Sequence, residues 1–198
     1  MQILRIDSAT TGDQSISRKL TGQITEHLLA RNPGATLVSR DLASDPLPHI
    51  DEVTTAAIRT PPETHEGAVA AAFPAERAVL DEFLASDIVV IGAPMYNFSI
   101  PSQLKAWLDR LGVPGVTFRY SSNGPEGLAG GRKVIIASSR GGAYETGGPA
   151  EHQESLLKIF LGFIGVEDVT FIRVENAGRG ADAIEQGFAQ AKEAIAAL

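Results

Sequence analysis

The sequence predicts an α/β fold in which helices cover both faces of a five-stranded parallel sheet. Short runs rich in β-branched residues, such as residues 88–91 and 134–137, are apolar throughout, which is typical of strands buried on both faces. These runs alternate with longer segments whose apolar residues recur at helical spacing. Because parallel neighbours need crossover connections, the alternation predicts a doubly wound sheet.

Length and composition indicate one globular domain spanning residues 1–198. The chain is 43% hydrophobic and 21% charged, and its net charge of −7, with no local Lys/Arg cluster, argues against a nucleic-acid partner. No run approaches the roughly 18 apolar residues of a membrane span, and a strand begins almost at Met1, so we expect a cytoplasmic protein without a membrane partner. The absence of cysteine excludes a disulfide, a thiolate nucleophile and a cysteine-based metal site.

The expected elements follow one another along the whole chain. The predicted strands are residues 2–7, 36–40, 88–91, 133–137 and 169–174. The predicted helices are residues 15–31, 51–59, 64–85, 101–111, 150–164 and 184–195. Four prolines between residues 41 and 62 indicate a long excursion from the sheet.

Three local features sharpen this prediction. Pro74 lies inside a helical pattern, so we expect a kink there or two helices that meet. Trp107 belongs to an apolar stripe that continues on both sides, and we expect it in the core. Alternation over residues 116–122 followed by Asn123-Gly124 predicts a β-hairpin with Asn-Gly as its turn.

The loops after the strands distinguish two common strand orders. The Rossmann order should show G-x-G-x-x-G after the first strand, whereas residues 8–15 contain only Gly12. The flavodoxin-like order, 2-1-3-4-5, places its site where the loops after strands one, three and four converge. These are the polar loop at residues 8–14, the MYNF loop at 95–98 and the SRGG loop at 139–142. The unusual loops of the chain therefore fall at one edge of the predicted sheet.

Each loop also has a purely structural interpretation. Ser15 and Ser17 could be helix caps, or they could seat a phosphate at a helix N-terminus. Tyr96 and Phe98 could be aromatics at the edge of the core, and the glycine pair could serve a tight turn or let a flat ring approach the backbone.

Several chemistries lack the residues they need. Gly92-Ala93-Pro94 stands where a response-regulator receiver carries its aspartate, and a low-molecular-weight phosphatase would need a cysteine. The G-x-S-x-G, Walker and zinc motifs are absent, and no metal site is expected. No nucleophile–base pair is evident near the loops, so we expect no catalytic side chain. A flat phosphorylated cofactor that does the chemistry itself suits what remains.

Together, several segments resemble the FMN-dependent NADH-azoreductase and NADH:quinone oxidoreductase family over nearly the full length. They are RDLA at 40–43, APMYNF at 93–98, GVTFRY and NGPEGL within 115–128, SSRGG at 138–142 and FLGFIG at 160–165. The resemblance implies a flavodoxin-like homodimer with one non-covalent FMN per subunit. It also implies two-electron reduction of quinones and reductive cleavage of aromatic azo compounds, with NADH or NADPH as donor. Both substrates are planar, so we expect ping-pong kinetics.

Carried onto this sequence, the resemblance implies specific binding residues. The phosphate would be held by Ser15, Ile16 and Ser17. The isoalloxazine would lie between Met95, Tyr96, Asn97 and Phe98 on one side and Ser139, Arg140, Gly141 and Gly142 on the other. The acceptor pocket would be formed by Arg59, Phe118, Tyr120 and the partner subunit's Phe163.

Two positions depart from the family pattern. Where the family often has a serine in the first loop, this chain has Ala9 with Ser8 beside it, and both are expected at the cofactor. A family histidine after the glycine pair is Tyr144 here.

Two other functions fit the same fold. One is a flavodoxin-like electron carrier that binds FMN but has no small-molecule acceptor of its own. The other is a flavin-free binding module. The long insertion at 41–85 and the hairpin favour an enclosed substrate pocket, and therefore an enzyme.

Overall fold

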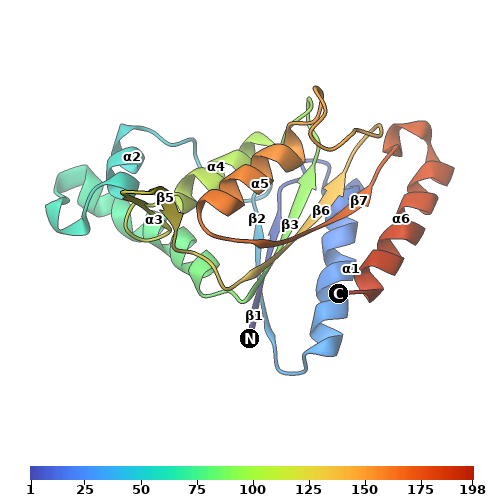
Figure 1. Ribbon diagram of the computed structural model, residues 1–198, viewed down its shortest axis with the longest axis horizontal. Helices are drawn as coiled ribbons and strands as arrows, with labels where there is room; N and C mark the ends of the chain where they lie inside the picture. Colours follow the sequence, from blue (N-terminus) through green and yellow to red (C-terminus); the bar gives the residue numbers. More distant parts are fainter.

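A parallel sheet of five strands in the order β2-β1-β3-β6-β7 forms the centre of the molecule. The structure is a computed structural model that describes all residues 1–198 (Figure 1). The strands of this sheet are β1 (Gln2–Asp7), β2 (Thr36–Asp41), β3 (Ile88–Pro94), β6 (Lys133–Ser139) and β7 (Asp168–Val174). Numbered among themselves, they have the order 2-1-3-4-5, which confirms the predicted doubly wound topology.

Helices cover both faces of this sheet (Figure 1). One face carries α1 (Ile16–Arg31) and α6 (Ala181–Ala196). The other carries α3 (Gly67–Leu84), α4 (Ser102–Leu111) and α5 (Gln153–Phe163). The short helix α2 (Glu52–Arg59) packs on α3 at the end of the molecule away from α1 and α6. Single 3₁₀ turns lie at Gly12–Gln14, Pro62–Thr64 and Ala177–Arg179.

Each layer of helices encloses its own apolar core. On the α3–α4–α5 side the core includes Trp107, which is fully buried and meets Phe83 edge to face at 6.0 Å between ring centroids. The prediction that Trp107 is a core residue is therefore confirmed. None of the helices is at once long enough and apolar enough to cross a membrane.

The proline in α3 neither breaks nor divides the helix, so the expectation of two helices meeting there is wrong. Pro74 lies inside one continuous helix that runs from Gly67 to Leu84. Pro74 cannot donate to the carbonyl of Ala70, but both residues are exposed, so water can reach that carbonyl.

A separate two-stranded hairpin, β4 (Phe118–Ser121) and β5 (Gly124–Gly127), leaves the main sheet. Its turn is shifted by one residue from the Asn-Gly prediction, because Ser121 pairs with Gly124 and Ser122-Asn123 forms the tip. Gly124 has φ +107° and so takes the left-handed role at the start of β5.

The base of the hairpin lies directly on the chain that leaves α5. A Cβ atom at Gly127 would come within 2.1 Å of the main-chain nitrogen of Gly165. Only glycine fits this contact, which fixes where the hairpin sits.

Candidate functional site

The three loops predicted to converge are joined by hydrogen bonds at the carboxyl edge of the sheet. The hydroxyl of Tyr96, after β3, accepts a hydrogen bond from the main-chain N–H of Thr10, after β1, at 3.0 Å. The N–H of Met95 donates to the carbonyl of Ser139, at the end of β6, at 2.8 Å. The structure therefore brings the first, third and fourth loops of the sheet together.

The N-terminus of α1 offers free hydrogen-bond donors at this edge. Ser15 is the N-cap, and its hydroxyl accepts from the N–H of Arg18 at 3.1 Å and lies 3.1 Å from the hydroxyl of Ser17. The main-chain N–H groups of Ile16 and Ser17 make no hydrogen bond within the protein. Capping and anion binding are thus compatible, because the cap uses one donor and leaves others for a ligand.

The MYNF loop is a tight turn with left-handed backbone at residues that are not glycine. Asn97 has φ 48° and Phe98 has φ 72°, between reciprocal main-chain hydrogen bonds of Tyr96 and Ser99 at 2.9 and 3.1 Å. This conformation is costly for such residues and persists only where its surroundings enforce it. The turn leaves the Phe98 side chain 51% exposed, at the edge of the three loops.

The SRGG loop presents open backbone beside this turn. Nothing lies within 4 Å of a Cβ position at Gly141, and the N–H groups of Gly141 and Gly142 make no hydrogen bond within the protein. The carbonyl of Gly141 accepts from the N–H of Gly178 at 2.9 Å, which ties the loop to the chain after β7. The loop can therefore receive a flat ligand edge without losing an existing contact.

Three of the expected cofactor residues use their side chains within the protein. Arg140 is buried, and its guanidinium is bound by three glutamates. The Ser8 hydroxyl is buried and donates to the carbonyl of Gly92 at 2.6 Å, and Ala9 is buried beside it. These side chains support the loops, so any contact with a cofactor falls to the backbone and to their neighbours.

The aromatic residues of the expected acceptor pocket lie together. Phe118 lies 4.5 Å from Phe163 and 5.7 Å from Tyr120 between ring centroids, all within one chain. Phe118 is buried and Tyr120 is 77% exposed, so the cluster presents one face to the outside. In the expected dimer Phe163 comes from the partner subunit, whereas here the chain's own Phe163 completes the cluster.

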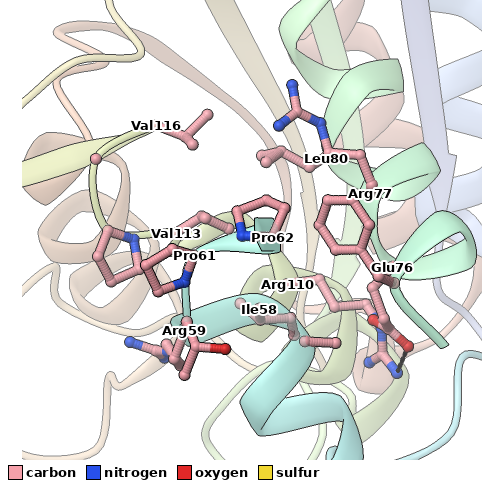
Figure 2. A pocket seen from close by; sticks show the side chains of 15 residues that line it. Ile58, Arg59, Pro61, Pro62, Glu76, Arg77, Leu80, Arg110, Val113 and Val116 are labelled. Carbon is pink, nitrogen blue, oxygen red and sulfur yellow. Dashed lines mark hydrogen bonds and ion pairs between the residues drawn. The ribbon is translucent and has the colours of Figure 1, made fainter. Parts of the chain in front are cut away.

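Arg59 lies apart from this cluster, in the wall of a cavity of about 420 Å³ (Figure 2). Apolar residues of α2, α3 and the chain after α4 line the cavity, among them Ile58, Leu80 and Val113. Arg59 makes no hydrogen bond or ion pair through its side chain, so its charge is available to a ligand.

The same cavity holds an ion pair that the sequence did not reveal. The Arg110 side chain is fully buried, and its Nε lies 2.6 Å from Oε2 of Glu76, drawn as a dashed line in Figure 2. Arg110 lies on the buried side of α4, among the apolar residues from which the helix was predicted. The two paired residues are 34 positions apart, so the sequence around either one gives no sign of the ion pair.

A second buried group that sequence reasoning missed lies behind the SRGG loop. It consists of Glu151, Gln153 and Glu154 at the start of α5, all buried. Glu151 accepts from the N–H groups of Gln153 and Glu154 at 2.9 and 2.7 Å and so caps the helix. Three polar residues opening an otherwise apolar helix were the signal that could have revealed this group.

The environment of Glu151 favours its charged form. Burial raises the pKa of the Glu151 carboxyl, but hydrogen bonds from the first turn of α5 and from Ser155, with the charge of Arg140, outweigh it. The pKa of Glu151 therefore lies below the ordinary value for a glutamate.

The fold and the converging loops define a protein of the flavodoxin-like class, and the family model described as "Flavodoxin-like fold" matches residues 1–198. An FMN-dependent NADH:quinone oxidoreductase from Sinorhizobium fredii is 49% identical over 200 residues, covering 99% of this chain and 96% of that protein. The enzyme of the same name from Acidovorax ebreus is 51% identical over 204 residues, covering 100% and 93%. The chain belongs to the FMN-dependent NADH:quinone oxidoreductase family.

A solved structure supports the same assignment. The crystal structure of an azoreductase from Bacillus anthracis has a TM-score of 0.86 and 27% identity, covering 100% of this chain and 98% of that one. The predicted fold and family resemblance are therefore confirmed.

Proposed function

We propose that this chain is an enzyme that binds FMN at the three joined loops and uses NADH to reduce quinones by two electrons. The observation that carries the proposal is the set of unused main-chain N–H groups at one edge of the sheet, Ile16 and Ser17 in the first turn of α1 and Gly141 and Gly142 in the loop after β6. The names of the relatives at 49% and 51% identity support the cofactor, the donor and the acceptor class.

The residues present fit FMN in charge and shape. A phosphate at the N-terminus of α1 would accept hydrogen bonds from the N–H groups of Ile16 and Ser17 and from serine hydroxyls, without needing a lysine. The open backbone at Gly141 gives a flat ring close access. When bound there, FMN supplies the two-electron redox chemistry.

The side chains then bind, orient and exclude water. Phe98 offers an exposed ring beside the open backbone, and the N–H groups of Gly141 and Gly142 can stabilise negative charge on the cofactor side. The exposed ring of Tyr120, packed on the buried Phe118, provides an apolar, planar surface for an acceptor. Arg59, with no partner of its own, is available to an acceptor's oxygen or anionic group.

Azo compounds form a second acceptor class, supported by the similarity to the azoreductase from Bacillus anthracis. They are aromatic and planar like quinones, so the same surface suits both. Cleavage of an azo bond to two amines needs four electrons, and therefore two molecules of NADH.

One planar molecule at a time fits between the aromatic residues, so NADH leaves before the acceptor binds. Initial rates at several fixed quinone concentrations should give parallel double-reciprocal lines. Intersecting lines would show both substrates bound together and would reject this scheme.

Anaerobic titration of the yellow protein with NADH and with NADPH, followed by a panel of quinones, tests the donor and the acceptor. Electron uptake without any quinone turnover would instead favour an electron carrier.

The proposed working unit is a homodimer in the cytoplasm, where NADH is available. From the sequence, part of the helix at 150–165 is expected in the interface, because Phe160, Leu161, Phe163 and Ile164 cover more than one helix face. In the structure Leu161 and Ile164 are buried in the core, and Phe160 and Phe163 are partly buried against it. The exposed apolar residue of α5 is Ile159, at 73%, which supports an interface centred there.

A further inference from the structure

Gln153, the first residue of α5, connects the ends of two central strands through one buried side chain. Its Nε2 donates to the carbonyl of Ala93, near the end of β3, at 2.7 Å. Its Oε1 accepts from the hydroxyl of Ser138 on β6 at 3.0 Å and from Nε of Arg140 at 2.9 Å. No other side chain in the structure hydrogen-bonds to both of these strand ends.

The Arg140 side chain is held in the same place from further directions. Its Nη2 lies 2.6 Å from Oε1 of Glu154 and 3.3 Å from Oε1 of Glu151, and Nη1 lies 3.3 Å from Oε1 of Glu175. Its main chain is also bound, because the N–H donates to Val174 at 3.0 Å. The Arg140 side chain therefore points into the protein, toward the three glutamates, and anchors the start of the SRGG loop.

Both strands that Gln153 joins lead into the loops of the proposed flavin site. Ala93 lies two residues before Met95, the first residue of the MYNF turn, and Arg140 lies immediately before Gly141. β3 and β6 are already paired along their length, from Ile88 with Lys133 to Pro94 with Ser139, and the hydrogen bond from Met95 to Ser139 is the main-chain contact just beyond that ladder. The ladder fixes the strands themselves, and the Gln153 contacts act where the two loops leave the sheet, between Ala93 on one side and Ser138 and Arg140 on the other.

We infer that Gln153 is a positioning residue for FMN, which acts by holding the β3 loop and the β6 loop at a fixed separation. This inference rests on the proposed function, because it assumes that the flavin ring lies between those loops. It requires no contact between Gln153 and the cofactor. The amide is suited to the task because it has both a donor and an acceptor, and the two strand ends need one of each.

The test compares two substitutions that separate these roles. Gln153→Met keeps the length of the side chain but leaves Ala93, Ser138 and Arg140 without this partner. Gln153→Glu keeps the two acceptor contacts, loses the donor to Ala93 and adds a negative charge that faces the Arg140 guanidinium. Gln190→Met, at an exposed position on α6, is the matched control. For each holoprotein, we would measure FMN dissociation on dilution, the visible spectrum of the bound flavin and its reduction potential.

We expect Gln153→Met to weaken FMN binding about tenfold or more, since buried polar groups lose their partners. Its bound-flavin spectrum should move toward that of free FMN, and its reduction potential should change. Gln153→Glu should recover part of the affinity, and the control should match the unsubstituted protein. A purely structural role would lower the unfolding temperature while leaving the spectrum and the potential of the bound flavin unchanged, and that result would overturn the inference.

Should Gln153→Met fail to fold, Ser138→Ala removes a single arm of the same connection. We expect it to weaken FMN binding about two- to tenfold. Unchanged affinity and spectrum in Ser138→Ala and Gln153→Glu together would also reject the inference. The unsubstituted protein separates this failure from a failure of the proposed function: if it retains no FMN, the function itself is wrong.

Discussion

The hydroxyl of Tyr96 accepts a hydrogen bond from the main-chain N–H of Thr10 at 3.0 Å, across 86 residues of sequence. This contact fastens the loop after β3 to the loop after β1, at the side of the site where the phosphate is expected. It makes the Tyr96 side chain part of the scaffold that joins two of the loops proposed to bind FMN.

Removing that hydroxyl should therefore loosen the cofactor site. Tyr96→Phe leaves the ring in place but deprives Thr10 of its acceptor, a loss of about 0.5–1.5 kcal/mol. We expect FMN affinity to fall about two- to tenfold, as measured by fluorescence titration. Tyr120→Phe is the control, because Tyr120 is exposed on the hairpin and its hydroxyl makes no hydrogen bond. Equal affinities for the two variants would contradict a role for the Thr10 contact.

Ser15 allows capping to be separated from phosphate binding. Ser15→Asp retains a good N-cap, so the stability of α1 should be preserved, but it places a negative charge where the phosphate is expected. FMN binding should weaken by more than tenfold in Ser15→Asp. In Ser15→Ala/Ser17→Ala, each lost charge-assisted hydrogen bond should cost about 1.5–3 kcal/mol of binding free energy.

Thermal unfolding without FMN and FMN titration, carried out together, check this prediction. Ser44→Ala, at an exposed position after β2, is the control for a serine outside the site. FMN affinity that survives both Ser15 substitutions would remove the phosphate from this helix end.

Tyr120 should affect the acceptor and leave the cofactor unaffected. Tyr120→Ala deletes the exposed ring of the aromatic cluster, so the KM for a quinone should rise about two- to tenfold. Tyr120→Phe keeps the ring and should behave like the unsubstituted protein. Steady-state kinetics with saturating NADH, together with FMN titration, separates the two effects. A parallel loss of FMN affinity would show that the ring belongs to the cofactor site.

The lowered pKa of Glu151 should make the free energy of unfolding depend on pH. Its pKa is lower in the folded protein than the ordinary value, so the folded state gains stability from the charged carboxylate above about pH 4.3. That gain is lost as the pH falls through the folded-state pKa. Glu151→Gln should therefore be less stable than the unsubstituted protein near pH 7, and the difference should shrink on acidification. Urea unfolding between pH 7 and pH 4 measures it; a difference independent of pH would assign the effect to packing.

Ile159 tests the proposed dimer. Ile159→Glu places a charge on the exposed apolar position of α5 and should shift the sedimentation of the protein toward the monomer at micromolar concentration. Gln186→Glu adds the same charge on the exposed side of α6 and should leave the assembly unchanged. An unsubstituted protein that sediments as a monomer with full activity would refute the dimer.

The strands, the helices and the edge at which the loops meet could be predicted because their signals are local. Apolar runs and helical spacing can be recognised from a few neighbouring residues. The strand order was predicted from the loops that follow the strands. The errors also have local causes. At Pro74 exposure lets water satisfy the carbonyl that loses its helical hydrogen bond, and at Gly124 the register of the hairpin moves the turn by one residue.

The direction of the Arg140 side chain could not be predicted from its neighbours. Its carboxylate partners lie 11, 14 and 35 positions further along the chain, Glu151 and Glu154 at the start of α5 and Glu175 after β7. They meet only when the sheet has formed, so the sequence showed a charged residue in the loop expected to bind flavin and nothing of its buried partners. The same reasoning applies to Gln153, whose contacts span 60 residues to Ala93.

The close approach of Gly127 to Gly165 limits how this protein can diversify. A change of either residue to one with a side chain would lift the hairpin from α5 and displace Phe118, although neither glycine is part of the aromatic cluster. The tip at Ser122-Asn123 has no such neighbour and is exposed, so insertions there leave the contact intact. Among related proteins, changes in acceptor preference are therefore expected to come from substitutions and insertions at the tip of the hairpin, while the two glycines at its base stay unchanged.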